Sequence, residues 1–216
     1  MGKSLKERVK DGFEGAAIKE YSNEYLKIIR ENAIKAEEDM GRATIFLMAT
    51  MVLFEFLIRG AISELSIGSF KLNDLTSIPL VIPALFSYLY FDLVVIIARS
   101  DRLSAIHRFI IRKLYPSIED NDLTEYLLFT PSLYEDKFFF KGKIGSIQYT
   151  LWVIQLLLLT LFVPAFFLIY SFYRLFGVAG LSYSLVWLSL IVSAIFFIQG
   201  FLITIALFIE TRYDRE

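Results

Sequence analysis

The sequence predicts an all-α, polytopic membrane protein with four transmembrane helices, cytosolic N-terminal amphipathic helices and a partly helical cytosolic connection. Two observations predict this class. Hydrophobic residues make up 56% of the chain and aromatic residues 16%, which exceeds the averages of soluble domains. The apolar residues also gather in long runs that reach about the 20 residues needed to cross a bilayer core. Lipid is therefore the expected solvent for much of the chain.

Residues 1–42 form the charged N-terminal segment that precedes the first apolar run. A charged stretch of this length differs from the short basic region of a signal peptide, so we expect no cleavage. Apolar residues recur every three or four positions, which predicts amphipathic helices divided near Gly12 and Gly15. This stripe packs on the protein itself or on a neighbouring subunit. Burial in lipid headgroups is the alternative, disfavoured because the polar face mixes acids with bases.

The four predicted spans form two hairpins, 43–98 and 147–209. In the first hairpin Leu65–Ser77 is expected to be a short polar turn. Pro79 and Pro83 stand near the start of the second span, where helix donors are free. Pro164 interrupts the third. The spans are expected at Ala43–Ile58 (extended by Gly60, Ala61 and Ile62), Ile78–Ala98, Ile147–Phe172 and Tyr183–Ile209.

Orientation follows from the basic residues near the span ends. Of the 22 Lys and Arg residues, all but Arg59, Lys71 and Arg174 belong to segment 1–42, connection 99–146 or tail 210–216. The positive-inside rule places these three segments in the cytoplasm. We therefore expect a multi-pass membrane protein with both termini cytoplasmic.

The connection 99–146 begins with a basic helix that is expected to end at Pro116. Its bases are candidates for binding anionic headgroups, a nucleotide or oligonucleotide, or the chain's own acidic stretch 119–136. The spacing of the bases does not choose among these ligands. His107 is expected at a surface or an interface. The candidate residues are Arg99, Arg102, His107, Arg108, Arg112 and Lys113.

No pattern typical of an enzyme is present. The chain has one histidine and no cysteine, which excludes thiolate metal sites and cysteine nucleophiles. The metalloprotease, nucleophile-elbow, dinucleotide-binding, P-loop and EF-hand patterns are also missing. We therefore predict a non-enzyme that needs no cofactor and no metal.

Polar residues within the spans are the remaining candidates for function. A carboxylate inside a span costs about 2.5 to 3.5 kcal/mol, so Glu55 and Asp92 are candidate pore-lining acids. The alternative is neutralisation, by Arg59 four residues after Glu55 and by Arg99 seven residues after Asp92. Gln155 and Gln199 are further pore candidates, although such residues more often join helices by hydrogen bonds.

This layout resembles the small multi-span effectors of bacterial antiphage defence systems. The resemblance rests on the charged N-terminus ending at Arg42, the four spans and the basic connection ARSDRLSAIHRFIIRK. In outline the chain is most similar to the channel subunit of Hailong systems, and next to the membrane subunit of Kiwa systems. The resemblance implies a homo-oligomeric ion channel, with four copies favoured. It further implies a cytosolic oligonucleotide or nucleotide ligand supplied by a soluble partner enzyme.

The sequence thus predicts a gated, homo-oligomeric ion channel or pore, acting as an antiphage defence effector that perturbs the membrane. A non-conducting adaptor that recruits a soluble partner through its cytosolic segments is the alternative. A transporter is disfavoured because the two hairpins share no inverted repeat.

Overall fold

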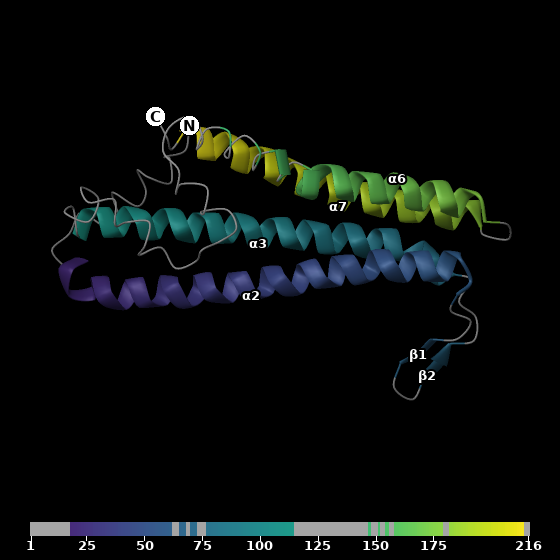
Figure 1. Ribbon diagram of the computed structural model, residues 1–216, viewed down its shortest axis with the longest axis horizontal. Helices are drawn as coiled ribbons and strands as arrows, with labels where there is room; N and C mark the ends of the chain where they lie inside the picture. The colour runs from purple at the N-terminus through teal and green to yellow at the C-terminus, as the bar shows by residue number, and fades with distance from the viewer. Residues whose placement is uncertain are drawn as a thin grey trace. The chain divides into compact units, whose positions relative to one another are not determined.

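The computed structural model describes residues 18–61, 65–67, 70–72, 77–114, 147, 151, 154–155, 158–178 and 182–213 (Figure 1). Helices account for nearly all of them. The chain divides into two compact units, Met1–Asp39 with Ile96–Gly145 and Met40–Val95 with Ser146–Glu216. The elements are α2 (Ile18–Ile58), β1 (Leu65–Ile67), β2 (Phe70–Leu72), α3 (Ile78–Leu114), the π-helical turn η3 (Leu158–Phe162), α6 (Val163–Phe176) and α7 (Tyr183–Tyr213).

Within the described residues, three helices are long and apolar enough to cross a membrane: Glu24–Ile58, Ile78–His107 and Tyr183–Leu207. They cover the second predicted span fully and most of the first and the fourth. The third predicted span corresponds to a shorter apolar helix over Thr160–Phe176. Upstream of η3, the described residues Ile147, Leu151, Ile154 and Gln155 are also helical. The coarse prediction of a helical protein with membrane-spanning segments is therefore confirmed to the extent that three helices could cross a membrane.

Two predicted span starts agree with the structure, since α3 begins at Ile78 and α7 at Tyr183. The helices extend further than the predicted spans do. α2 runs without a break from Ile18 across Arg42 to Ile58, and α3 continues through Pro83 to Leu114. Hydropathy locates the lipid-crossing part of a helix, whereas helices of this length continue into water.

The connection expected to be a polar turn contains a small β-hairpin instead. β1 and β2 pair antiparallel, with Leu65 opposite Leu72 and Ile67 opposite Phe70. This register leaves two residues between the strands, Gly68 and Ser69 in the sequence. Glycine followed by serine is typical of two-residue hairpin loops. The prediction of a polar turn was wrong because it used the polarity of the segment and did not consider its turn residues.

The end of α2 is a Schellman motif. The amide of Ala61 donates to the carbonyl of Phe56 (2.9 Å), and the amide of Gly60 donates to that of Leu57 (3.1 Å). Gly60 adopts φ 66°, a left-handed conformation that costs other residues about 1 to 2 kcal/mol. The sequence Arg59-Gly60 therefore ends the helix directly after its apolar segment.

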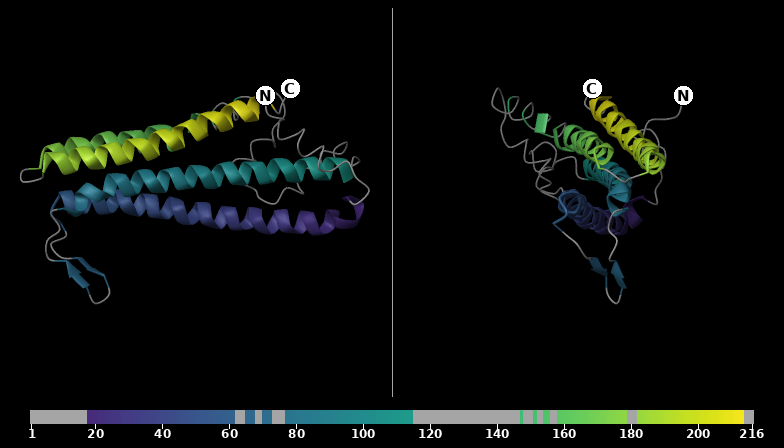
Figure 2. Two further views of the ribbon diagram at one scale, coloured as in Figure 1. Left: turned by 180° about the vertical axis from the view of Figure 1, so that it is seen from behind. Right: turned by 90° about the vertical axis from the view of Figure 1, so that its right-hand side faces the viewer.

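Aromatic side chains join the helices of the second unit. On α2, Phe54 contacts Phe167 of α6 edge to face, with ring centroids 5.6 Å apart. Phe86 of α3 packs on the same Phe167 at 4.3 Å. Tyr90 of α3 stacks on Phe197 of α7 at 5.4 Å. In this unit α3 thus lies between α2 and α7, as both views in Figure 2 show.

The outer faces of these helices are apolar, which suits a lipid solvent. Large hydrophobic side chains are exposed on every long helix, among them Ile45 and Met48 on α2, and Ile191 and Ile195 on α7. In water such a surface would be an association or aggregation site. In a bilayer it needs no covering, because lipid tails are as apolar as leucine.

In the first unit, small and apolar side chains of α2 are buried, namely Ile29, Ala33 and Ala36. On α3, His107, Ile110 and Ile111 are buried as well. Positions 107, 110 and 111 follow one another at helical spacing, so they share a face of α3. The buried face of this part of α3 therefore combines apolar side chains with the histidine.

Candidate functional site

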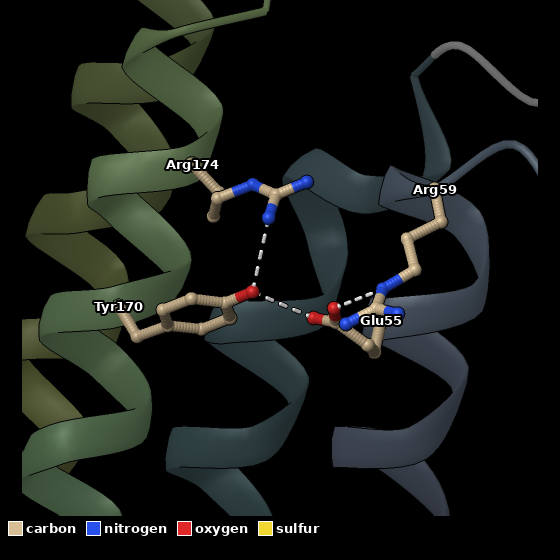
Figure 3. A network of polar contacts seen from close by, with 4 residues as sticks. All are labelled: Glu55, Arg59, Tyr170 and Arg174. Atoms are coloured by element: carbon tan, nitrogen blue, oxygen red, sulfur yellow. Dashed lines mark hydrogen bonds and ion pairs between the residues drawn. The ribbon is translucent and has the colours of Figure 1, made fainter.

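A network of four polar side chains lies between α2 and α6 in the second unit (Figure 3). One carboxylate oxygen of Glu55 accepts a hydrogen bond from Nε of Arg59 at 2.5 Å. Its other oxygen accepts one from the hydroxyl of Tyr170 at 2.8 Å. Tyr170 in turn accepts a hydrogen bond from Nη1 of Arg174 at 3.2 Å. The carboxylate is thus bound from both sides within one chain.

Helical geometry places these four residues. Arg59 follows Glu55 by four residues and Arg174 follows Tyr170 by four, so each pair shares one face of its helix. Phe54, next to Glu55, packs edge to face on Tyr170 with centroids 6.5 Å apart. The guanidinium of Arg174 also lies 5.8 Å from the centre of the Tyr170 ring. Packing and charge together hold the phenol against the carboxylate.

From the sequence, Glu55 could be either a pore-lining acid or a carboxylate neutralised by Arg59. Its contacts support neutralisation. With both oxygens occupied inside one chain, Glu55 is a poor candidate for a pore-lining acid. Sequence reasoning identified Arg59 as a partner but missed Tyr170 and Arg174. Their spacing of four residues at the end of an apolar helix was the available signal.

Asp92 has a different environment. It is partly exposed on α3, and among the described residues no hydrogen bond or ion pair reaches it. The suggested partner Arg99 is exposed and does not pair with it. An acid on a lipid-crossing helix that has no partner in its own chain needs water or another chain beside it.

Asp92 belongs to an exposed stripe of α3. The stripe follows alternating steps of four and three residues, the spacing by which parallel helices pack along one seam. Its apolar members are between 38% and 63% exposed, whereas Phe86, Tyr90 and Val94 on another face of α3 are buried. The same spacing continues in the sequence to Arg99 and Arg102, both exposed. The stripe comprises Val81, Leu85, Tyr88, Asp92 and Val95.

The other polar residues of the spans fall into two groups. Gln155 and Gln199 are exposed and so do not join helices within the chain. Ser189 of α7 donates to the carbonyl of Leu80 on α3 at 2.5 Å, as expected of a residue that joins helices. Ser193 donates to a carbonyl one turn earlier in its own helix. Gln155 and Gln199 therefore remain lumen candidates beside Asp92.

The basic run lies on the C-terminal half of α3. Arg99 and Arg102 are exposed, as a ligand-binding or lipid-binding role requires. The side chains of Arg108, Arg112 and Lys113 lie outside the described part of the structure. His107 is only 2% exposed, so the expectation of a surface position was wrong. It occupies the buried apolar stripe of α3, which its spacing from Ile110 and Ile111 indicated.

These features fit an α-helical membrane protein that has a polar network inside its second unit. Within an apolar part of its helices, Asp92 has no partner among the described residues. Within the described residues no group of three or more His, Cys, Asp or Glu side chains gathers as a metal site would require. Comparison of the chain with family models, curated proteins and solved structures finds no match.

Proposed function

We propose that copies of this chain assemble in the membrane into a gated ion channel whose lumen is lined by the stripe of α3 that contains Asp92. The observation that carries the proposal is that Asp92 is partly exposed and has no partner among the described residues. It lies on a helix that is long and apolar enough to cross a membrane. Facing lipid would cost this group about 2.5 to 3.5 kcal/mol. A water-filled axis shared by several copies removes that cost.

The stripe has the composition of a lumen with one selective position. A ring of aspartates at one height favours cations, and the apolar residues above and below it form a narrow passage that gates by dewetting. The exposed Gln155 and Gln199 are further lumen or intersubunit positions. The resemblance to Hailong channel subunits favours four copies.

The complete proposal has four crossings per copy, with Thr160–Phe176 extended upstream as the third. Both termini are cytoplasmic and the membrane is the bacterial inner membrane. Arg99 and Arg102 then stand at the cytosolic mouth, where a nucleotide or oligonucleotide made by a partner enzyme binds and changes conductance. In this proposal the chain is an antiphage defence effector.

Ion flux through liposomes that contain the purified protein tests the proposal. Asp92→Asn should lower cation flux and cation preference severalfold without changing the mass of the assembled particle, because it removes the ring of charge and keeps the shape. Glu37→Gln is the matched control, since it removes an exposed acid from α2 outside the apolar part of that helix. Flux and selectivity unchanged by Asp92→Asn would remove Asp92 from the lumen.

Assembly is tested separately, and the chain suits the test because it has no native cysteine. Two single-cysteine variants are compared, Leu85→Cys and Ile169→Cys. Leu85 lies on the α3 stripe, whereas Ile169 is exposed on α6. Oxidation should link copies through position 85 and much less through position 169. An assembled protein that conducts no ions would favour the adaptor over the channel.

A further inference from the structure

A groove opens beside the network of Glu55 and Arg174, where α2 and α6 end. Its volume is about 580 Å³, within the range of small-molecule sites. Three apolar side chains, one phenol and one guanidinium form its walls, so it suits an amphipathic ligand. The lining residues are Ile58, Tyr173, Arg174, Phe176, Gly177 and Val178.

Arg174 brings unused hydrogen-bonding capacity to this groove. In the part of the chain that the structure describes, one of its N–H groups is bonded to another side chain, the hydroxyl of Tyr170. A guanidinium has five such donors in a planar fork that matches phosphate. At the end of a membrane helix, the phosphate of a phospholipid is the acceptor of matching shape and charge.

The balance of charge decides which phospholipid fits. Arg59 and Arg174 carry two positive charges and Glu55 one negative charge, so the side chains sum to about one positive charge. The C-terminal ends of α2 and α6 each add the equivalent of about half a negative charge. The site is therefore close to neutral and offers little net attraction to an anionic lipid.

A zwitterionic headgroup matches this pattern of local charges. Its phosphate meets the guanidinium, and its ammonium meets the carbonyl groups that helix ends leave without an intrahelical partner. At α6 the amide of Gly177 bonds the carbonyl of Arg174 and the amide of Val178 bonds that of Leu175. Among the described residues, no amide donates to the carbonyls of Phe176 and Gly177, which can accept a hydrogen bond from an ammonium group.

We infer that the groove binds a zwitterionic aminophospholipid of the phosphatidylethanolamine type. The phosphate lies on Arg174, the ammonium lies near the helix-end carbonyls, and an acyl chain lies against Ile58, Phe176 and Val178. The inference does not depend on ion conduction.

The test uses the full chain in nanodiscs that contain equal parts of phosphatidylethanolamine, phosphatidylglycerol and phosphatidylcholine. Native mass spectrometry of the released protein then counts the lipids that stay bound. The unchanged protein should retain phosphatidylethanolamine in preference to the other two lipids. Arg174→Gln should lower that retention roughly tenfold, the loss expected from charge-assisted hydrogen bonds. Arg30→Gln removes an exposed arginine from α2 outside the groove and should leave retention unchanged.

A second variant keeps the test decisive if Arg174→Gln disturbs folding through Tyr170. Val178→Trp fills the groove without touching the polar network and should also lower retention. Added inorganic phosphate should not displace the lipid, because it offers no acyl chain to the groove. Preference for phosphatidylglycerol, retention unchanged by either groove variant, or displacement by phosphate would each overturn the inference.

Discussion

Gly200 permits the close approach of α7 to α3, and adding one methyl group there should destabilise the protein. A Cβ atom at this position would lie 2.8 Å from Cε1 and 3.2 Å from Cδ1 of Tyr90, and 3.5 Å from Cα of Phe91. The first distance is shorter than any ordinary carbon contact. Gly200→Ala therefore requires a side chain or a helix to shift.

Tyr90 has little room to give way. It is 1% exposed and its ring stacks on Phe197 at 5.4 Å. Overpacking of this kind costs about 1 to 3 kcal/mol. Alanine regains about 1 kcal/mol by its higher helix propensity. The expected net loss of stability for Gly200→Ala is therefore about 0 to 2 kcal/mol.

Gly41→Ala is the matched control, because it makes the same change in the middle of α2 where a Cβ meets nothing within 4 Å. It should gain about 1 kcal/mol from propensity alone. The difference in unfolding free energy between the two variants isolates the clash and should be about 1 to 3 kcal/mol. Circular dichroism during denaturation in mixed micelles measures both variants.

Tyr90→Ala removes the atoms that Gly200→Ala would strike, so the double variant should show a favourable coupling energy. Tyr90→Phe keeps the ring and should give no such rescue. If Gly200→Ala proves as stable as Gly41→Ala, then α3 and α7 do not pack at the described distance and the reasoning fails.

Two further experiments test the end of α2 and its contact with α6. Tyr170→Phe and Glu55→Gln, made singly and together, should give a coupling energy of about 1 kcal/mol, because the two side chains share a 2.8 Å hydrogen bond. If their losses of stability are additive in the same denaturation assay, the bond contributes nothing. Gly60→Ala should lose about 1 to 2 kcal/mol from strain at φ 66°, whereas Gly177→Ala, at φ −85°, should lose less. Equal losses would contradict the left-handed end of α2.

Hydropathy predicted helix starts well because it acts locally. Runs of apolar residues after Ser77 and Ser182 located the starts of α3 and α7, whereas the first span was expected to continue through Gly60 to Ile62 and α2 ends at Ile58. Pro116 correctly indicated how far α3 extends, since the basic helix was expected to end there and α3 is helical as far as Leu114. Beyond Ala98 its charged residues alternate with an apolar stripe, which supports a helix in water as well as in lipid.

The candidate site was only partly predictable, because it depends on contacts between distant segments. Glu55 and Arg59 are four residues apart, so their pairing was visible in the sequence. Tyr170 lies 115 residues after Glu55, and only the packing of α2 against α6 brings them together. For Asp92 the sequence identified the residue, but its lack of a partner is a property of the fold.

The π-helical turn η3 has a consequence for insertions and deletions. Over Leu158–Phe162 the chain holds about one residue more than an α-helix of equal rise, directly before Pro164. Deleting one residue there should yield a continuous helix and leave the register of α6 intact. The residues upstream of the turn would then rotate by about 100° about the helix axis. The side of the helix on which Gln155 lies therefore depends on the number of residues between it and α6.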